Sequence, residues 1–577
     1  MKLRKILAMV MALALLCATF AACGDTSGTS SSAGTSSAAS DSGDSSAAEE
    51  GETTTGATGG ELNLRSTMEP TSLNTLLATY AYDFTPISAM VECLYRDDET
   101  DTPQPAAAES VDISDDNLVY TFHLREDAVW SNGDPVVATD FEFAWQQALN
   151  PAVASNYAYM LFFIHNAEAY LEGEVEWTDV GVKVIDEYTL EVTLDNPLPY
   201  ATDLFAFYTL APINQSFYEE VGADLYATDP EYFCTNGMYN LTEWNHNSDI
   251  VFEKNPNYWN ADAVGPDKIT YKIITDDQAA LNSYLSKEID YNELDTGETV
   301  QQVENAGMEV GVKPARSTFY VMCNTANEYL SNVNLRKALA LGYDKQALVD
   351  TVFQNDNQPA TSFVPPAIYG AAGADGPTFQ EAYLEQHGGE LWPATGDTEQ
   401  AMQYLETALS ELGCTAADIT LSIDCGDNAQ SQSYAAFLQE QWRVNLGLEN
   451  ITINPMQTKQ VSANRNSGDY CMSLAGWSPD YNDPMTFLDM WVTGGGNNQT
   501  GWGSEEYDSL VAQATAEADV DARQELLYQC EDILADQCPI LLTYWECQNY
   551  SYDTEKILDG QIITANQTNF WYASLAE

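Results

Sequence analysis

The sequence predicts a mixed α/β body of several domains, preceded by an export signal and a flexible tether. The chain has 577 residues, enough for three or four domains at about 150 residues each. Hydrophobic residues make up 45% and aromatic residues 11%, too much for a generally disordered chain. Segments rich in β-branched and aromatic residues alternate with amphipathic segments at helical spacing. No repeat of 20–50 residues is present, which argues against a solenoid or a propeller.

The first 22 residues have the three parts of a bacterial export signal. Three basic residues lie within residues 2–5, and the 15 residues from Ile6 to Phe20 are apolar and uncharged. That run is short for a membrane span but suits a signal peptide. Phe20-Ala21-Ala22-Cys23 resembles a lipobox. We therefore expect a lipoprotein signal peptide over residues 1–22 and lipidation at Cys23; the alternative is a plain secretory peptide cut after Ala22.

Residues 23–60 are expected to form a disordered tether. Of the 37 residues from Gly24 to Gly60, 31 are Ser, Thr, Gly or Ala, and the other six are acidic. This composition cannot build a core and behaves as a flexible chain. Its root-mean-square reach is on the order of 35 Å, which suits a body held near a membrane by its lipid.

The body begins near residue 61, and its elements can be placed from their patterns. Strands are expected at Val119–Leu124, Thr189–Leu194, Ile250–Glu253, Ile269–Ile274 and Phe319–Cys323. Helices are expected at Ala138–Asn150, Gln400–Leu412, Tyr434–Leu446, Ser504–Ala518 and Asp521–Gln537. At the first of these helices, Thr139 and Glu142 have the spacing of a capping box.

The charge of the chain excludes several kinds of partner. There are 21 Lys and Arg against 88 Asp and Glu, a formal net charge of −67. Such a surface repels phosphate backbones and anionic lipid headgroups, so neither nucleic acid nor charge-driven membrane binding is expected.

Motifs for catalysis or for a cofactor are missing from the sequence. It has no GxSxG, no HExxH and no GxxxxGK motif. The four His are scattered, and none of the nine Cys after Cys23 forms a CxxC, so neither a metal nor a cofactor is expected. Cys414 with Cys425 is a candidate disulfide that the sequence does not settle. Because carboxylates are so abundant, a paired-acid glycosidase remains an alternative.

Several longer motifs resemble one family in their order along the chain. The stretch from Asp115 to Phe141, DDNLVYTFHLREDAVWSNGDPVVATDF, resembles the signature of family 5 extracellular solute-binding proteins, the oligopeptide- and dipeptide-binding lipoproteins of ABC importers. Further matches are TNGMY at 235–239, KNPNYW at 254–259, EIDY at 288–291, VNLRKAL at 333–339, QWRVNLG at 441–447 and GWSPDYNDP at 476–484. The resemblance runs from about Leu62 to the C-terminus.

The resemblance implies a two-lobed fold of the type II periplasmic binding-protein class, with an extra domain inserted in the first lobe. The expected boundaries are 61–82, 206–315 and 546–577 for lobe I, 83–205 for the extra domain and 316–545 for lobe II. The lobes of such a protein close on a ligand by a hinge motion.

The last motif is where the resemblance places the ligand. A buried peptide must pair its backbone groups, and a strand edge beside a glycine allows this. Its α-ammonium needs a carboxylate. In the oligopeptide binders an Asp at the position of Asp480 takes that role, so we expect Asp480 as the amine anchor, with Gly476, Trp477 and Ser478 as pairing and lining residues. The alternative is that Asp480 only caps a turn.

Four further residues are expected on the ligand path. Glu69 matches a Glu-containing segment of the family, although Pro70 beside it cannot donate an N–H. Asn236 and Asn292 are lining candidates or turn residues. Arg465 aligns with a basic residue that recognises the ligand carboxylate, whereas Leu474 replaces a second one. How the ligand C-terminus is bound stays open.

The function expected from the sequence is capture without catalysis. A lipid-anchored monomer on the outer face of the cell membrane, or in a periplasm if the cell has an outer membrane, would bind oligopeptides and deliver them to an ABC transporter permease. The alternatives are a non-peptide ligand in the same role, either an oligosaccharide stacked on Trp477, Trp491 and Trp502 or a metal chelate, and a secreted glycoside hydrolase. An acidic surface adhesin that binds calcium through residues 97–101 is a third class, although that cluster lacks the Gly of a calcium loop.

Overall fold

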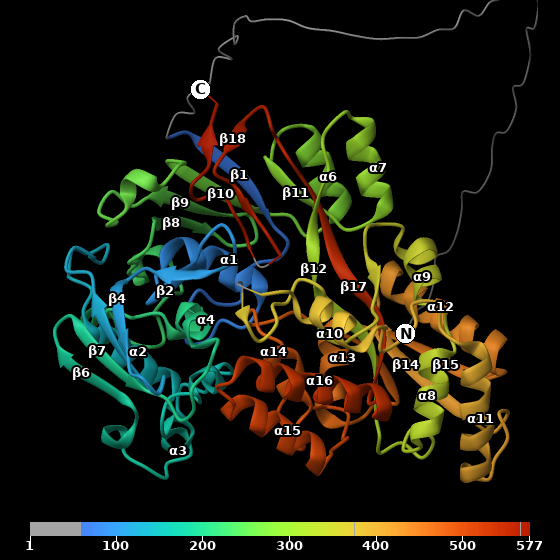
Figure 1. The fold of residues 1–577 in the computed structure, drawn as a ribbon. Helices are drawn as coiled ribbons and strands as arrows, with labels where there is room; N and C mark the ends of the chain where they lie inside the picture. The colour runs from blue at the N-terminus through green and yellow to red at the C-terminus, as the bar shows by residue number, and fades with distance from the viewer. Residues whose placement is uncertain (1–58, 374–375, 566, 577) are drawn as a thin grey trace, which may run out of the picture. The chain divides into compact units, whose positions relative to one another are not determined.

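Two long paired strands run through the middle of the molecule and join its parts (Figure 1). In the computed structural model, strand β12 (Gly311–Cys323) pairs antiparallel with β17 (Ile540–Tyr552). They lie in a seven-stranded sheet of order β11-β17-β12-β16-β14-β15, with β13 paired to β17. The other strands of this sheet are β11 (Tyr291–Leu294), β13 (Gln358–Pro359), β14 (Thr420–Gly426), β15 (Asn450–Met456) and β16 (Met472–Trp477).

Two four-stranded sheets lie to the left of β12 and β17 in Figure 1, on the side away from β14 and β15. One has the order β1-β10-β9-β8 and combines β1 (Glu61–Ser66) with β8 (Tyr239–Asn245), β9 (Asp249–Lys254) and β10 (Lys268–Ile273). The other has the order β4-β5-β7-β6 and is antiparallel. Its strands are β4 (Ala108–Ile113), β5 (Val119–Leu124), β6 (Val182–Asp186) and β7 (Thr189–Thr193). All four belong to residues 108–193, so this sheet is built from one continuous stretch of chain.

Helices cover these sheets, and most of the expected ones occur with bounds within two residues of the prediction. They include α2 (Ala138–Ala148), α11 (Thr398–Leu412), α12 (Ala429–Leu446), α15 (Glu505–Ala516) and α16 (Val520–Gln537), of which α12 begins earlier than expected. The others are α1 (Ala81–Met90), α3 (Ala167–Leu171), α4 (Ala201–Ala206), α5 (Gln215–Val221), α6 (Asp277–Leu285), α7 (Gly297–Asn305), α8 (Val333–Leu341), α9 (Lys345–Leu348), α10 (Phe379–His387), α13 (Thr458–Ser467) and α14 (Met485–Leu488). Short strands β2 (Tyr95–Asp97), β3 (Pro103–Pro105), β18 (Ile557–Asp559), β19 (Ile562–Ile563), β20 (Thr568–Asn569) and β21 (Ser574–Leu575) complete the fold.

The start of α2 differs from the expected capping box. Val137, not Thr139, is the N-cap residue, and Thr139 already lies in the first helical turn. The Asp140 carboxylate accepts hydrogen bonds from the Val137 backbone N–H at 3.2 Å and from the Trp130 indole at 2.8 Å. The N-cap was predicted two residues too late, because Asp140 and not Glu142 is the third helical residue whose carboxylate accepts from the N-cap backbone N–H.

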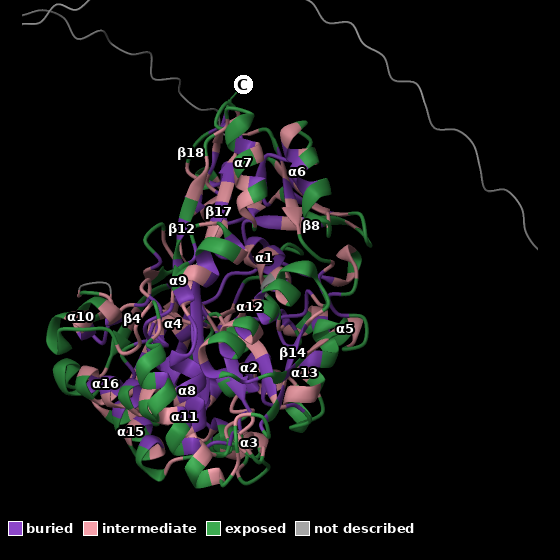
Figure 2. Ribbon diagram, turned by 90° about the vertical axis from the view of Figure 1, so that its right-hand side faces the viewer, coloured by how far each residue is buried: buried purple, intermediate pink, exposed green. Residues whose placement is uncertain are grey.

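Burial follows the layers of the fold. One apolar core lies between α8, α11, α12 and β14 and contains Leu339, Leu405, Ile423 and Trp442. A larger core extends through the two four-stranded sheets and includes Tyr320 of β12 and Trp545 of β17. Exposed residues occur on the outer faces of helices such as α11 and α15 (Figure 2). The strand predicted over Val119–Leu124 is present as β5, in which Tyr120, Phe122 and Leu124 are buried and the residues between them are not.

The structure describes residues 59–373, 376–565 and 567–576, and these belong to one compact unit. The expected signal peptide over 1–22, the lipidation site Cys23 and all of the expected tether except residues 59 and 60 lie outside the described part. The nine cysteines after Cys23 are unpaired, and these include Cys414 and Cys425.

Candidate functional site

A cavity of about 980 Å³ lies beside the central strands. Its walls come from α1, from β2, from α4 with the residues that follow it, from β12, from the loop after β16, and from the C-terminal segment near residue 570. Charged groups are concentrated there, although the chain has few cations. The charged residues that line it are Arg65, Arg96, Asp97, Asp203, Glu293, Lys313, Arg316, Asp480 and Glu546.

The end of β16 forms one wall of the cavity, and four predicted site residues lie on it. Gly476, Trp477, Ser478 and Asp480 all line the cavity. Gly476 is paired with Phe319 of β12, and a Cβ atom at Gly476 would lie 2.7 Å from the Phe319 ring. Only glycine therefore fits at this point of the wall, and the absence of a side chain leaves its backbone open to a neighbour.

The carboxylate of Asp480 is held by groups from a distant part of the chain. It accepts hydrogen bonds from the hydroxyls of Tyr157 at 3.3 Å and Tyr159 at 3.1 Å. Burial raises the pKa of Asp480 from its ordinary value of 3.8 to about 6, although the two tyrosines and the nearby Arg316 act in the opposite direction. A carboxylate in this position gains from any cation that enters the cavity.

Asp480 does not cap the turn in which it lies; its neighbour Asp483 does. Asp483 accepts a hydrogen bond from the Met485 backbone N–H at 2.8 Å, at the start of α14. The two oxygens of Asp483 also accept from the two Nη atoms of Arg523, both at 2.8 Å, with side-chain exposures of 6% and 1%. This buried bidentate pair fixes the loop that carries Asp480.

Three contributors to this region were not found from the sequence. Tyr157 and Tyr159 belong to none of the helices or strands predicted from the sequence, so nothing in the sequence placed them beside residue 480. Arg316 is buried beside the same loop, and its Nη2 atom donates to the Pro479 carbonyl at 2.9 Å. The one signal in the sequence that could have pointed to Arg316 is that Lys and Arg are rare in this chain, so each of them is a candidate for a specific role.

The structure places two other predicted residues in hydrogen-bond networks away from the cavity. Glu69 accepts from the Trp244 indole at 2.8 Å and the Asn247 backbone N–H at 2.8 Å, and it also contacts His246. Asn236 is buried, and its amide exchanges two hydrogen bonds with the backbone of Glu92, at 2.9 and 3.0 Å. Both side chains have their polar groups satisfied by the protein itself.

Asn292 and Arg465 are also outside the cavity wall. Asn292 is buried on β11, where it pairs with Ser551. Arg465 donates to the Leu474 carbonyl at 3.0 Å and to the Ser462 hydroxyl at 3.3 Å, and it lines a separate, more open depression beside residues 495–501. The Arg465 guanidinium, which was expected to bind a ligand carboxylate, is thus hydrogen-bonded to the backbone carbonyl of Leu474.

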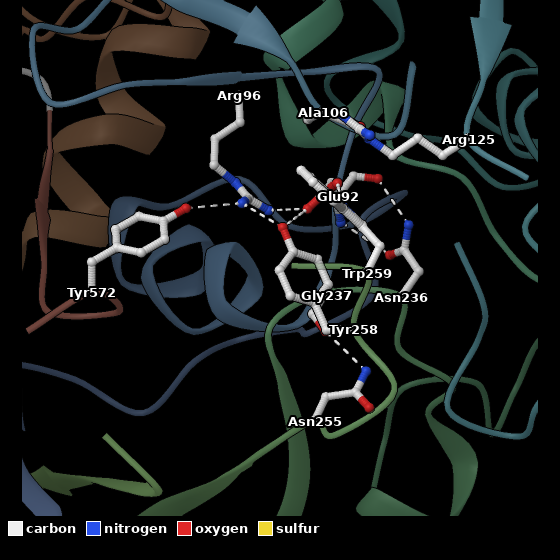
Figure 3. A network of polar contacts seen from close by, with 10 residues as sticks. All are labelled: Glu92, Arg96, Ala106, Arg125, Asn236, Gly237, Asn255, Tyr258, Trp259 and Tyr572. Atoms are coloured by element: carbon white, nitrogen blue, oxygen red, sulfur yellow. Dashed lines mark hydrogen bonds and ion pairs between the residues drawn. The ribbon is translucent and has the colours of Figure 1, made fainter. Parts of the chain in front are cut away.

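A network of polar contacts reaches the cavity through Arg96 and Tyr572, which line it (Figure 3). The Glu92 carboxylate is nearly fully buried and accepts from Arg96 at 2.5 Å, from the Trp259 indole at 2.6 Å and from the Tyr258 hydroxyl. Arg96 also donates to the hydroxyls of Tyr258 at 2.9 Å and Tyr572 at 3.2 Å. The charge of Arg96 is therefore already balanced by Glu92.

The tryptophans considered for sugar stacking differ in position. Trp477 lines the cavity, whereas Trp491 and Trp502 are buried in the core. Within residues 59–373, 376–565 and 567–576, no group of three or more His, Cys, Asp or Glu residues could hold a metal ion. In the same ranges no helix has both the length and the apolar character needed to span a bilayer.

The fold is that of the type II periplasmic binding proteins, with a large cavity beside two continuous strands and an acid on one wall. The comparisons with known proteins agree with this fold class, which confirms the expectation from the sequence. The model of the bacterial extracellular solute-binding proteins, family 5, matches residues 102–499. The chain belongs to that family.

Relatives and solved structures cover most of the chain. The oligopeptide-binding protein OppA of Bacillus subtilis is 34% identical over 501 residues, which are 85% of this chain and 88% of that protein. The substrate-binding domain of an oligopeptide ABC transporter from Bacillus anthracis has a TM-score of 0.77 at 32% identity and covers 90% of this chain and 100% of that one. Listeria monocytogenes OppA bound to peptide has a TM-score of 0.77 at 30% identity, over 90% and 99% of the two chains.

Proposed function

We propose that this protein captures oligopeptides outside the cell and delivers them to the permease of an ABC importer. The observation that carries the proposal is the Asp480 carboxylate, which lies at the cavity wall next to the strand end formed by Gly476, Trp477 and Ser478. The family, the names of the relatives and the peptide in the Listeria structure support a peptide ligand.

The chemistry of the wall suits the amino end of a peptide. The α-ammonium replaces one or both tyrosine hydroxyls on Asp480 and supplies the charge that the buried carboxylate lacks. The peptide backbone then runs along the end of β16, where Gly476 permits close approach. Recognition of main chain without side chains is the property that allows one protein to accept many peptides.

Capture requires the cavity to open, and the central strands are the natural hinge. The expected boundaries at 315/316 and 545/546 both fall inside the paired strands β12 and β17. We assign 61–82, 206–315 and 546–577 to lobe I, 83–205 to the extra domain and 316–545 to lobe II. The contacts of Asp480 with Tyr157 and Tyr159 then join lobe II to the extra domain, and only the closed form is expected to dock productively on the permease.

The remaining parts of the proposal concern anchoring and chemistry. Lipidation at Cys23 holds a monomer to the outer face of the membrane, and residues 24–60 act as the tether. The protein carries out no reaction and uses no cofactor or metal, in keeping with a family of solute-binding proteins.

Mass spectrometry of ligands that co-purify with the protein tests the proposal. The protein is isolated under native conditions, then unfolded in guanidinium to release what it holds. We expect a mixture of short peptides with free amino ends. A single sugar or metal chelate as the released ligand would overturn the peptide assignment while leaving the importer role. Hydrolysis of a glycoside panel by the purified protein would contradict the whole assignment.

A further inference from the structure

Next to Asp480 the cavity has an aromatic pocket, defined by Phe84, Tyr157, Phe207 and Tyr208. All four residues line the cavity and are only half-buried. The Tyr157 and Phe207 rings are stacked with centroids 5.5 Å apart, and Phe84 contacts both at 5.9 and 5.4 Å. Tyr208 stacks on Phe84 at 6.0 Å. Half-buried aromatic rings that face an enclosed cavity are surface that a ligand covers.

Tyr157 connects the aromatic pocket to the amine anchor. Its hydroxyl donates to Asp480, while its ring belongs to the wall of the pocket. In a peptide the first side chain branches from the carbon that carries the α-ammonium. An ammonium on Asp480 therefore places the side chain of the first residue, and no later one, directly beside these rings.

Two further carboxylates line the same part of the cavity. Asp203 lies on α4, which ends immediately before Phe207, and Asp97 lies on β2, against which α4 packs. Burial raises the pKa of Tyr208, and the charge of Asp97 raises it further, so Asp97 lies near this ring of the aromatic pocket. Burial raises the pKa of Asp203 to about 8, and the charges of Asp97 and Asp483 act in the same direction, whereas the backbone N–H groups of Asp203 and Asn482 lower it.

The nearby cations are already in use. Arg96 is neutralised by Glu92 in the network of Figure 3. Asp483 is paired with Arg523. Arg316 acts on Asp97, Asp101 and Asp480 together, so one guanidinium serves three acids. Asp203, with its pKa at about 8, is mostly protonated at neutral pH in the empty cavity, and Asp97 shares one guanidinium with two other acids. A cation that enters this part of the cavity can therefore pair with both, and the aromatic rings beside them add a face that attracts cations.

We propose that the aromatic pocket binds the side chain of a Lys or Arg at the first position of the peptide, with its aliphatic stem along Phe84, Tyr157 and Phe207 and its charged end at Asp97 and Asp203. This inference rests on the proposed function, because it uses the peptide's α-ammonium on Asp480 to place the side chain. The preferred substrates are oligopeptides that begin with a basic residue.

The physical reason is that such a side chain matches both features of the pocket. Its methylene groups cover aromatic surface, its cation lies against ring faces, and its charge allows Asp203 to ionise inside the cavity. An apolar side chain would cover the rings but would bring no positive charge to Asp97 and Asp203. An acidic side chain would add a third acid beside Asp97 and Asp203.

Calorimetric titration with five tetrapeptides tests the proposal. Each ends in Ala-Ala-Ala, and the first residue is Lys, Nε-acetyl-Lys, Phe, Ala or Glu. The acetylated residue keeps the stem and loses the charge. The protein is first unfolded, dialysed and refolded to remove bound ligand. We expect the Lys peptide to bind about 10-fold or more tightly than the acetyl-Lys and Ala peptides, and the Glu peptide to bind most weakly.

The variant Asp203→Asn separates the pocket from the anchor. It keeps the shape of the side chain and an oxygen for the Asn482 N–H, so we expect the Ala peptide to bind within about twofold of the wild-type value while the preference for Lys falls to about threefold or less. Asp115→Asn makes the same change of charge at an exposed turn and controls for the long-range field. Thermal unfolding of both variants checks the fold.

The outcomes of the proposal and of the proposed function are distinguishable. If none of the five peptides binds to folded protein, the proposed function fails. If the peptides bind but Lys has no advantage over acetyl-Lys, or Phe binds more tightly than Lys, the basic pocket is wrong and peptide capture stands. An unchanged preference for Lys in Asp203→Asn, or an equal loss in Asp115→Asn, would also overturn it.

Discussion

Replacement of Asp480 by Asn should weaken peptide binding about 100-fold without unfolding the protein. The substitution keeps the size of the side chain and its acceptor oxygen for Tyr157 or Tyr159, and it removes only the charge. The loss should therefore appear in the affinity for a peptide with a free amino end. The stability of the empty protein should change little, because the pKa of Asp480 is raised: the cost of burying the carboxylate outweighs what the two tyrosines and Arg316 contribute.

The magnitude follows from the environment of the carboxylate. The pKa of Asp480 lies at about 6 instead of 3.8, so the ionised form is disfavoured in the empty cavity by about two pKa units. At 1.36 kcal/mol per unit this is roughly 3 kcal/mol, which a bound ammonium can recover. Truncating one partner of a buried charge pair costs about 2–5 kcal/mol, and 3 kcal/mol corresponds to roughly 150-fold in Kd.

The assay is calorimetry at pH 7.5 with a double-mutant design. A neutral tetrapeptide and its N-acetylated form are titrated into wild-type protein and into Asp480→Asn, each refolded free of ligand. We expect acetylation to weaken binding to the wild type about as much as the substitution does. For the variant, acetylation should change the Kd less than about threefold, because the charge partner is already gone.

One result would refute this reasoning. If Asp480→Asn weakens the free and the acetylated peptide by the same factor, the carboxylate acts on the shape of the cavity through the two tyrosines and not on the ammonium. Equal affinity of wild type and variant for the free peptide would remove Asp480 from the site altogether.

Three other predictions concern pH, packing and the loop that carries the anchor. A neutral peptide should bind about tenfold more weakly at pH 5 than at pH 7, because Asp480, with its pKa near 6, takes up a proton as the pH falls. The Kd should be flat above pH 7, and a flat profile down to pH 5 would contradict an ionised anchor. Asp483→Ala should lower the free energy of unfolding by about 3–5 kcal/mol in urea, because it leaves Arg523 buried without its partner, and the double variant Asp483→Leu, Arg523→Met should lose clearly less. Gly476→Ala should weaken peptides of every sequence by about tenfold or more, since its Cβ meets Phe319 at 2.7 Å and closes the strand edge; unchanged calorimetric affinity would mean that the peptide does not run past this residue.

Much of the fold was open to prediction because local patterns carry it. The period-two alternation of β5 and the helical spacing in α2 and α16 are written in residues that are close together in the chain. The first residue of α2 was predicted correctly, but its N-cap was placed two residues too late, because Asp140 and its partner Trp130, which lies outside the helix, were not recognised. Local patterns also said nothing about the pairing of β12 with β17, whose residues are more than 200 positions apart.

The residues of the candidate site also differ in how far the sequence could predict them. The motif that contains Asp480 lies in one short segment, so it was found as a unit, and its four chosen residues all reach the cavity. Arg465 and Glu69 were chosen singly by alignment, and the structure gives their polar groups to neighbours in the protein. A single residue type in a sequence does not reveal which partners the fold will bring to it.

The sequence by itself determined the family and the mixed α/β class and pointed to Asp480 as a candidate anchor, since each of these depends on motifs whose residues are close together in the chain. Only the tertiary structure decided what surrounds that anchor. Tyr157 and Tyr159 are more than 300 residues from Asp480, and Asp97 and Asp203 come from two further segments of the chain. Their shared cavity is set by packing between distant elements, where burial and neighbouring charges fix the pKa of each acid, and these quantities have no signature in the local order of residues.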